Sequence, residues 1–108
     1  MVRSISEIKK VAKEYKKELK RHNIHVSRVI LYGSYAKGNP KPYSDIDLVV
    51  ISSDLSRYPP LRRQELLAEL TMNIDAHLEV IGYTPKEMSK SGATIFGQIL
   101  HETGRILN

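Results

Sequence analysis

The chain contains no cysteine among its 108 residues, and it has no long run of apolar residues. The absence of cysteine excludes a disulfide framework and any zinc site built on thiolates. No segment approaches the roughly 20 consecutive apolar residues that a membrane-spanning helix needs, and the charged N-terminal segment does not resemble a signal peptide. We therefore expect a cytoplasmic protein.

The length and composition are those of one globular domain that spans residues 1–108. Apolar residues make up 41% of the chain and charged residues 27%, and the net charge is +5. A basic chain favours polyanionic partners such as nucleotides, nucleic acid or an acidic protein surface. Much of the charge lies in one segment near the N-terminus, where lysines also serve as a solvated helix face. The charge alone therefore does not predict nucleic-acid binding.

Two short motifs lie close together near the middle of the chain. Gly33-Ser34 follows an apolar segment, and ten residues later comes Asp45-Ile46-Asp47-Leu48 in a segment of strand-like composition. Residues two apart on a strand point to the same face, so the carboxylates of Asp45 and Asp47 should project together. Either motif alone has a plain structural explanation, as a turn or a strand end. Their combination favours a functional site.

The chemistry of these residues suits phosphate transfer. Two neighbouring carboxylates repel each other and tend to share a proton unless a cation lies between them. Mg²⁺ prefers oxygen ligands and usually keeps substrate phosphates in its shell. Gly33 and Ser34 can offer backbone N–H groups and a hydroxyl to those phosphates. The pattern therefore predicts phosphoryl or nucleotidyl transfer.

The order of these motifs resembles the signature of the DNA polymerase β-like nucleotidyltransferase superfamily. That signature is a glycine, a glycine or serine, a spacer, and then acid–apolar–acid–apolar. The fuller forms, Gly-Ser-x-Ala-x-Gly from Gly33 and Ser-Asp-Ile-Asp-Leu from Ser44, are similar to its minimal nucleotidyltransferase (MNT) branch. The segments 83–87 and 99–105 also resemble that branch, so the resemblance runs over most of the chain.

The resemblance implies a fold and a metal site. The expected fold is α/β (α+β), with helices packed against a small mixed sheet of three or four strands. One or two Mg²⁺ ions would be held by Asp45, Asp47 and a third carboxylate from a neighbouring strand. Counting back from Tyr83-Thr84-Pro85, Glu79 matches that third position, and Asp75 is the alternative. The same third carboxylate is the candidate catalytic base.

The resemblance also implies a nucleotide-binding site beside the metal. Gly33 and Ser34 would hold the triphosphate of ATP, the donor substrate. Lys37 lies one helical turn beyond Ser34 and could supply a positive charge. Many relatives carry arginine there, and lysine is a point charge rather than a bidentate fork. Ser44, directly before the acidic motif, is a further candidate for nucleotide binding.

Periodicity and turn residues place the other elements along the chain. A capping box of Ser4 and Glu7 should begin the first helix. We expect helices over 5–21 and 61–73, strands over 26–32, 45–52 and 75–83, a connecting loop over 52–60, and a C-terminal helical segment over 87–103 that begins after Thr84 and is interrupted at Ser91-Gly92. A strand over 75–83 would place Asp75 and Glu79 on the same face.

The family implies the transfer of AMP from ATP to a hydroxyl group. In the MNT branch the acceptor is a tyrosine on a separate HEPN-type toxin, and the nucleotidyltransferase acts as its antitoxin. The acceptor here would come from such a partner chain, or from a second copy in a homo-oligomer. Two alternatives remain: a catalytically silent module that masks a partner, and a basic nucleic-acid-binding domain. The second is weaker, because no helix-turn-helix, RRM or KH pattern is present.

Overall fold

The computed structural model describes residues 2–89 and 95–107. A four-stranded sheet has the order β3-β2-β1-β4 and contains β1 (Arg28–Tyr32), β2 (Ile46–Ile51), β3 (Leu78–Tyr83) and β4 (Arg105–Ile106). Strand β1 pairs antiparallel with both β2 and β4, whereas β2 and β3 are parallel. The sheet is therefore mixed, and the predicted α+β fold is confirmed.

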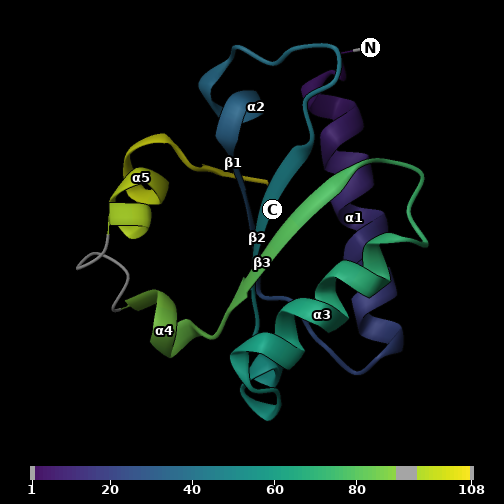
Figure 1. Ribbon diagram of the computed structural model, residues 1–108, viewed down its shortest axis with the longest axis vertical. Coiled ribbons are helices and arrows are strands. Elements are labelled where there is room, and N and C mark those ends of the chain that lie inside the picture. Colours follow the sequence, from purple (N-terminus) through teal and green to yellow (C-terminus); the bar gives the residue numbers. More distant parts are fainter. Residues whose placement is uncertain (1, 90–94, 108) are drawn as a thin grey trace.

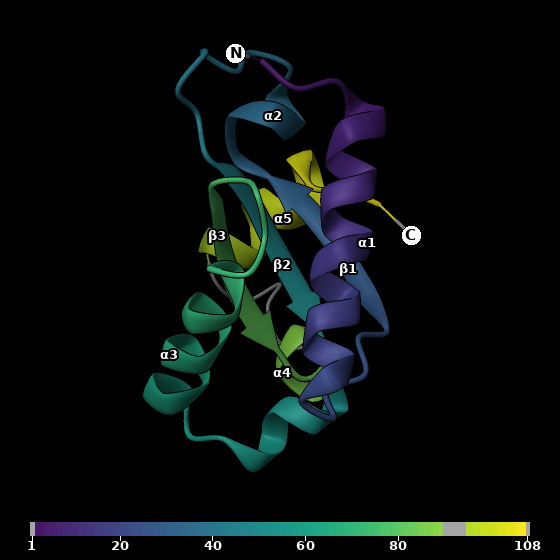
Figure 2. The ribbon, with the colours of Figure 1, turned by 90° about the vertical axis from the view of Figure 1, so that its right-hand side faces the viewer.

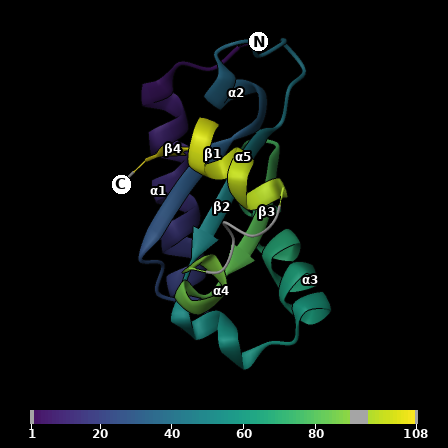
Figure 3. The same cartoon turned by 90° about the vertical axis from the view of Figure 1, so that its left-hand side faces the viewer.

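Helices cover both faces of this sheet. In Figure 1 the sheet is seen nearly edge-on. Helices α1 (Ile5–Arg21) and α3 (Pro60–Thr71) lie to its right, and α4 (Pro85–Ser89) and α5 (Ile95–Thr103) lie to its left. Figure 2 shows α1 lying across the first face, and Figure 3 shows α5 crossing the opposite face. Two short elements, α2 (Gly33–Lys37) and the 3₁₀ helix η1 (Ser53–Arg57), connect the strands. None of the described helices combines the length and apolarity needed to cross a membrane.

Strand β2 is buried from both sides because its side chains alternate between two apolar clusters. Leu48 and Val50 belong to the larger cluster under α1 and α3. Val49 and Ile51 belong to a smaller cluster with Leu100 of α5. Asp47 follows the same alternation, so it lies on the α5 face of the sheet.

Helix α1 has the predicted bounds, and its predicted capping box is confirmed. The Ser4 hydroxyl accepts a hydrogen bond from the Glu7 amide, and the Glu7 carboxylate accepts one from the Ser4 amide. The apolar stripe of the helix is buried against the sheet. In this stripe the Tyr15 hydroxyl donates a hydrogen bond of 2.7 Å to the carbonyl of Leu67, which ties α1 to α3.

Several predicted bounds were wrong. The second strand begins at Ile46, so Asp45 precedes it, and the third begins only at Leu78. Asp75 lies in a bend before that strand, and its carbonyl accepts a hydrogen bond from the Arg3 guanidinium (3.3 Å). The loop predicted over 52–60 contains η1, and the helix predicted over 61–73 spans Pro60–Thr71. The interruption predicted at 91–92 lies outside the described residues.

The outer edge of β3 is closed by two side chains of α3. The Gln64 amide donates to the Val80 carbonyl (3.1 Å) and its oxygen accepts from the Gly82 amide (3.2 Å). Buried Arg63 donates to the Gly82 carbonyl and to the Glu87 carboxylate at 2.7 Å, which joins α3 to α4. These side chains satisfy backbone groups that a further strand would otherwise pair.

We expect Gln64→Ala to lower the free energy of unfolding by about 2 kcal/mol, because it leaves one backbone donor and one acceptor unpaired in a partly buried place. Urea unfolding measures this loss, and hydrogen exchange of residues 78–83 should become faster. Gln98→Ala, at an exposed position of α5, is the matched control and should change stability by less than about 0.5 kcal/mol. Equal effects of the two substitutions would contradict the conclusion that Gln64 stabilises the outer edge of β3.

Candidate active site

Three neighbouring strands bring the candidate residues into one row across the sheet. Tyr32, the last residue of β1, is paired with Asp47 of β2, and Asp47 is paired in turn with Glu79 of β3. Because directly paired residues point to the same face, all three side chains lie on the α5 face. The row is at the end of the sheet where β1 runs into α2 (Figure 1).

Asp47 and Glu79 form a carboxylate pair, and the ionisation of both carboxylates at the same time is unfavourable. The pKa of Asp47 is raised to about 6, from a usual value of 3.8. The largest cause is burial at the end of the second apolar cluster, followed by a hydrogen bond with Glu79 and the charges of Glu79 and Asp45. A raised carboxyl pKa means that the pair retains a proton more readily than an ordinary aspartate. A cation between the two carboxylates would relieve the same repulsion.

Gly33 lies directly against this pair. Its φ of +73° is in the left-handed region, and a Cβ built on it would overlap the Oδ2 atom of Asp47. Glycine is therefore required twice at this position, for its backbone conformation and for the space that the carboxylate occupies. The contact joins the Gly33-Ser34 turn and the acidic motif, which are separated in sequence, into a single site.

The structure separates the predicted metal ligands into two groups. Asp47 and Glu79 are together, whereas Asp45 is exposed just before β2 and acts on Asp47 through its charge. Within residues 2–89 and 95–107, no group of three or more His, Cys, Asp or Glu residues is arranged to hold a metal ion. Two carboxylates still suit Mg²⁺, which often binds one or two protein carboxylates and completes its shell with water and substrate phosphates.

The other predicted residues occupy different surroundings. Asp75 is exposed in a bend before β3. Ser34 lies in the first turn of α2, and Lys37, the last residue of that helix, is exposed. The Ser44 hydroxyl accepts a hydrogen bond of 2.9 Å from the Lys41 amide, and Ser44 lines a cavity of about 280 Å³ beside α1. Ser44 therefore shapes its loop.

Tyr32 is a residue of this site that the sequence did not reveal. The pKa of its phenol is raised to about 12, mainly by burial and in addition by the charges of Asp47 and Glu79. The hydroxyl therefore stays protonated at neutral pH and keeps its hydrogen-bond donor. Its strand and face could be read from the sequence, but its place beside Asp47 depends on the register between β1 and β2.

The fold and this site define a nucleotidyltransferase domain. A family model described as "Nucleotidyltransferase domain" matches residues 8–96. The protein named "Putative protein adenylyltransferase MJ1215" from Methanocaldococcus jannaschii is 36% identical over 77 residues, which cover 71% of this chain and 88% of that protein. The chain therefore belongs to the nucleotidyltransferase family, and the resemblance found in its sequence is confirmed.

Solved structures agree with this assignment. A crystal structure described as a "putative nucleotidyltransferase" from Sulfolobus solfataricus has a TM-score of 0.60 at 20% identity, over 80% of this chain and 75% of that one. At that identity the likeness shows the fold alone. A chain from a crystal structure of a "toxin-antitoxin with AMP-PNP" has a TM-score of 0.59 at 26% identity, over 88% of this chain and 71% of that one.

Proposed function

We propose that the chain is a Mg²⁺-dependent nucleotidyltransferase that moves AMP from ATP to a hydroxyl group of a partner protein. The observation that carries this proposal is the Asp47–Glu79 carboxylate pair packed against the Gly33 turn. The relative named as a protein adenylyltransferase supports a protein acceptor. The neighbouring structure described with AMP-PNP, an ATP analogue, supports an adenine nucleotide as donor.

Each residue has a role that follows from its place. The Gly33 backbone and the Ser34 hydroxyl hold the triphosphate, and exposed Lys37 adds positive charge nearby. Asp47 and Glu79 would hold Mg²⁺, and Asp45, two residues before Asp47, would supply the third carboxylate. When bound there, Mg²⁺ supplies the charge that neutralises the phosphates. Ser44 has only an indirect part, through the shape of its loop.

The transfer itself is an in-line displacement at phosphorus. The acceptor oxygen forms a bond to the α-phosphorus of ATP while the bond from that phosphorus to the pyrophosphate oxygen breaks. Pyrophosphate leaves with the electron pair, and the proton of the acceptor hydroxyl passes to the Glu79 carboxylate. Glu79 is exposed on its strand, so an incoming hydroxyl can reach it.

The proposed partner is a HEPN-type toxin, modified on a tyrosine, with this chain as its antitoxin. The expectation comes from the MNT resemblance, and the toxin–antitoxin structure among the similar folds supports it. A tyrosine hydroxyl suits this chemistry, since its oxygen becomes nucleophilic as its proton is removed by a nearby base.

The test is calorimetric titration with ATP, GTP, CTP and UTP, with and without Mg²⁺. We expect ATP to bind only when Mg²⁺ is present. Glu79→Gln should reduce transfer to the partner by at least about a hundredfold, because it removes both a ligand and the base. Asp75→Asn is the matched control and should leave transfer unchanged.

Two results would contradict parts of this proposal. If Asp75→Asn abolishes transfer and Glu79→Gln does not, the third carboxylate is Asp75. If none of the four nucleotides binds, also when the partner is present, the chain is a silent module that masks its partner.

A further inference from the structure

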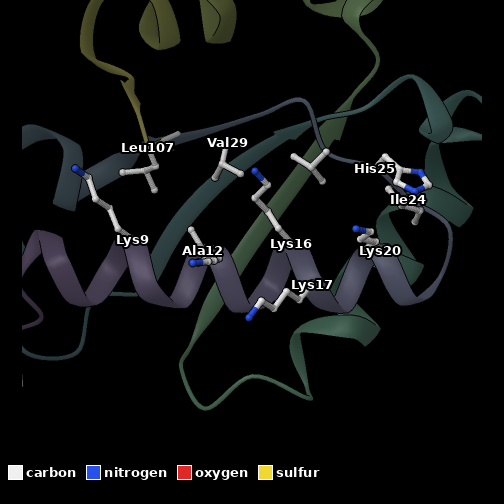
Figure 4. A pocket seen from close by; sticks show the side chains of 11 residues that line it. Lys9, Ala12, Lys16, Lys17, Lys20, Ile24, His25, Val29 and Leu107 are labelled. Atoms are coloured by element: carbon white, nitrogen blue, oxygen red, sulfur yellow. The ribbon is translucent and has the colours of Figure 1, made fainter.

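A groove of about 630 Å³ runs along α1, on the face of the sheet opposite the carboxylate pair. It lies between α1, the start of β1 and the C-terminal end of the chain (Figure 4). We call it the lysine groove, and it is lined by Lys9, Ala12, Lys13, Lys16, Lys17, Lys20, Ile24, His25, Val26, Val29 and Leu107. It is more than twice the volume of the cavity beside Ser44.

The groove combines a small apolar floor with a positive rim. Ala12, Ile24 and Val29 of the floor are buried in the core, so the apolar surface that a partner can cover comes from half-buried Val26 and Leu107. Figure 4 shows Val29 and Leu107 facing α1 across the groove, while the lysine side chains spread along the helix. Among the described residues, none of the ion pairs involves any of its five lysines. Glu18 of the same helix is buried on another side, where it contacts Arg21 and Asn73. In the part of the chain that the structure describes, the lysines of the rim therefore keep their ammonium groups free of close carboxylate partners.

We propose that the lysine groove binds an acidic, amphipathic segment of another protein. Such a segment can bury apolar side chains on the floor while its carboxylates meet the lysines of the rim. Lysine suits this arrangement, because its apolar stem packs on the floor while its ammonium group stays in water. From Lys9 to Lys20 the helix rises about 16 Å, which matches roughly three helical turns of a bound segment.

Two other occupants fit the groove less well. A nucleic acid would use aromatic side chains for base stacking or arginines for phosphate forks, and the groove is lined by neither. Its phosphodiester backbone would also leave the apolar floor without a partner. A second copy of this chain would carry the same net charge of +5 and be repelled.

The position of the groove has a consequence for function. Asp47 and Glu79 lie on the other face of the sheet, so a segment in the lysine groove leaves the carboxylate pair accessible. The groove would therefore hold a partner in place rather than block transfer. The proposal stands without the transfer reaction, because nucleotide binding and groove binding can be measured separately.

The experiment uses a fluorescein-labelled peptide of about twelve residues, with Leu and Glu at helical spacing, and follows its anisotropy. We expect saturable binding that weakens as NaCl rises from about 50 to about 500 mM, because exposed charges are screened. Lys13→Glu/Lys16→Glu should weaken binding at least about tenfold, since two attractions become repulsions. Val26→Ser should weaken it about fivefold by removing apolar surface from the floor.

The control variant is Lys10→Glu/Lys86→Glu, which makes the same change in net charge at exposed positions outside the groove. It should bind the peptide as the parent chain does, and all variants should still bind ATP with Mg²⁺. No saturable peptide binding, or equal weakening by the two double variants, would overturn the proposal. So would tighter, groove-dependent binding of a duplex DNA of about twelve base pairs, which would make the groove a nucleic-acid site.

Discussion

Gly33→Ala should abolish nucleotide binding and lower the free energy of unfolding by about 3 kcal/mol. About 1 kcal/mol of this arises because alanine is strained at a φ of +73°. The remainder arises because the new Cβ would overlap Oδ2 of Asp47, so that either the turn or the carboxylate must move. Both the phosphate turn and the acidic pair would then be displaced. Chemical unfolding and ATP titration with Mg²⁺ measure the two effects.

Gly38 provides the matched control, because its φ of +78° imposes the same strain while a Cβ there meets open space. Gly38→Ala should therefore cost only about 1 kcal/mol and leave nucleotide binding intact. A double-mutant cycle isolates the steric part: in an Asp47→Ala background, Gly33→Ala should cost about as little as Gly38→Ala. If the penalty at Gly33 is unchanged by Asp47→Ala, the overlap is not its cause.

The fold was predictable wherever a local pattern decides the structure. Helix α1 has its predicted bounds because a capping box and an apolar stripe act within one segment. Strand ends were less predictable, because the start of a strand depends on which neighbour its backbone can pair with. Asp75 has the spacing of a strand residue, yet it lies in a bend before β3, because the pairing of β3 with β2 begins only at Leu78.

The sequence predicted several residues of the site, but not which of them the strand pairing brings together. The sequence indicated Gly33, Asp45 and Asp47 by type and spacing, but the parallel pairing of β2 with β3 decides that Glu79 meets Asp47. The antiparallel pairing of β1 with β2 adds Tyr32 to the row from the other side. Asp45, identical in type to Asp47 and two residues away, is separated from the pair because it precedes the first residue of the strand. The lysine groove needs the tertiary contact of α1 with the C-terminal residues.

Asp47→Asn should abolish Mg²⁺-dependent nucleotide binding and, at neutral pH, stabilise the metal-free protein. Nucleotide binding is lost because a neutral amide cannot replace the charge of a metal-binding carboxylate. Stability rises because the folded protein raises the pKa of Asp47 from 3.8 to about 6, so folding opposes its ionisation. After allowance for partial solvent exposure, we expect about 1 kcal/mol at pH 7.5 without Mg²⁺.

The sign of this effect gives it a distinct pH profile. Between about pH 4 and 6 the folded protein binds more protons at Asp47 than the unfolded chain does, so stability falls as the pH rises through that window. Asp47→Asn removes this fall, and the difference between variant and parent should grow from pH 4 to pH 6.5 and shrink when Mg²⁺ is added. Urea unfolding at pH 4.5, 5.5 and 7.5 measures it; parallel profiles would contradict the proposed electrostatic repulsion.

Asp54→Asn is the control of opposite sign. Hydrogen bonds from the His25 backbone and ring hold the pKa of Asp54 below its usual range. Asp54 therefore contributes stability above its unfolded pKa, which is lost as the pH falls through its folded pKa. Asn at this position should destabilise the protein at neutral pH and leave nucleotide binding intact. If Asp47→Asn stabilises the protein and Asp54→Asn destabilises it, the electrostatic repulsion is specific to the carboxylate pair, where a bound cation can relieve it.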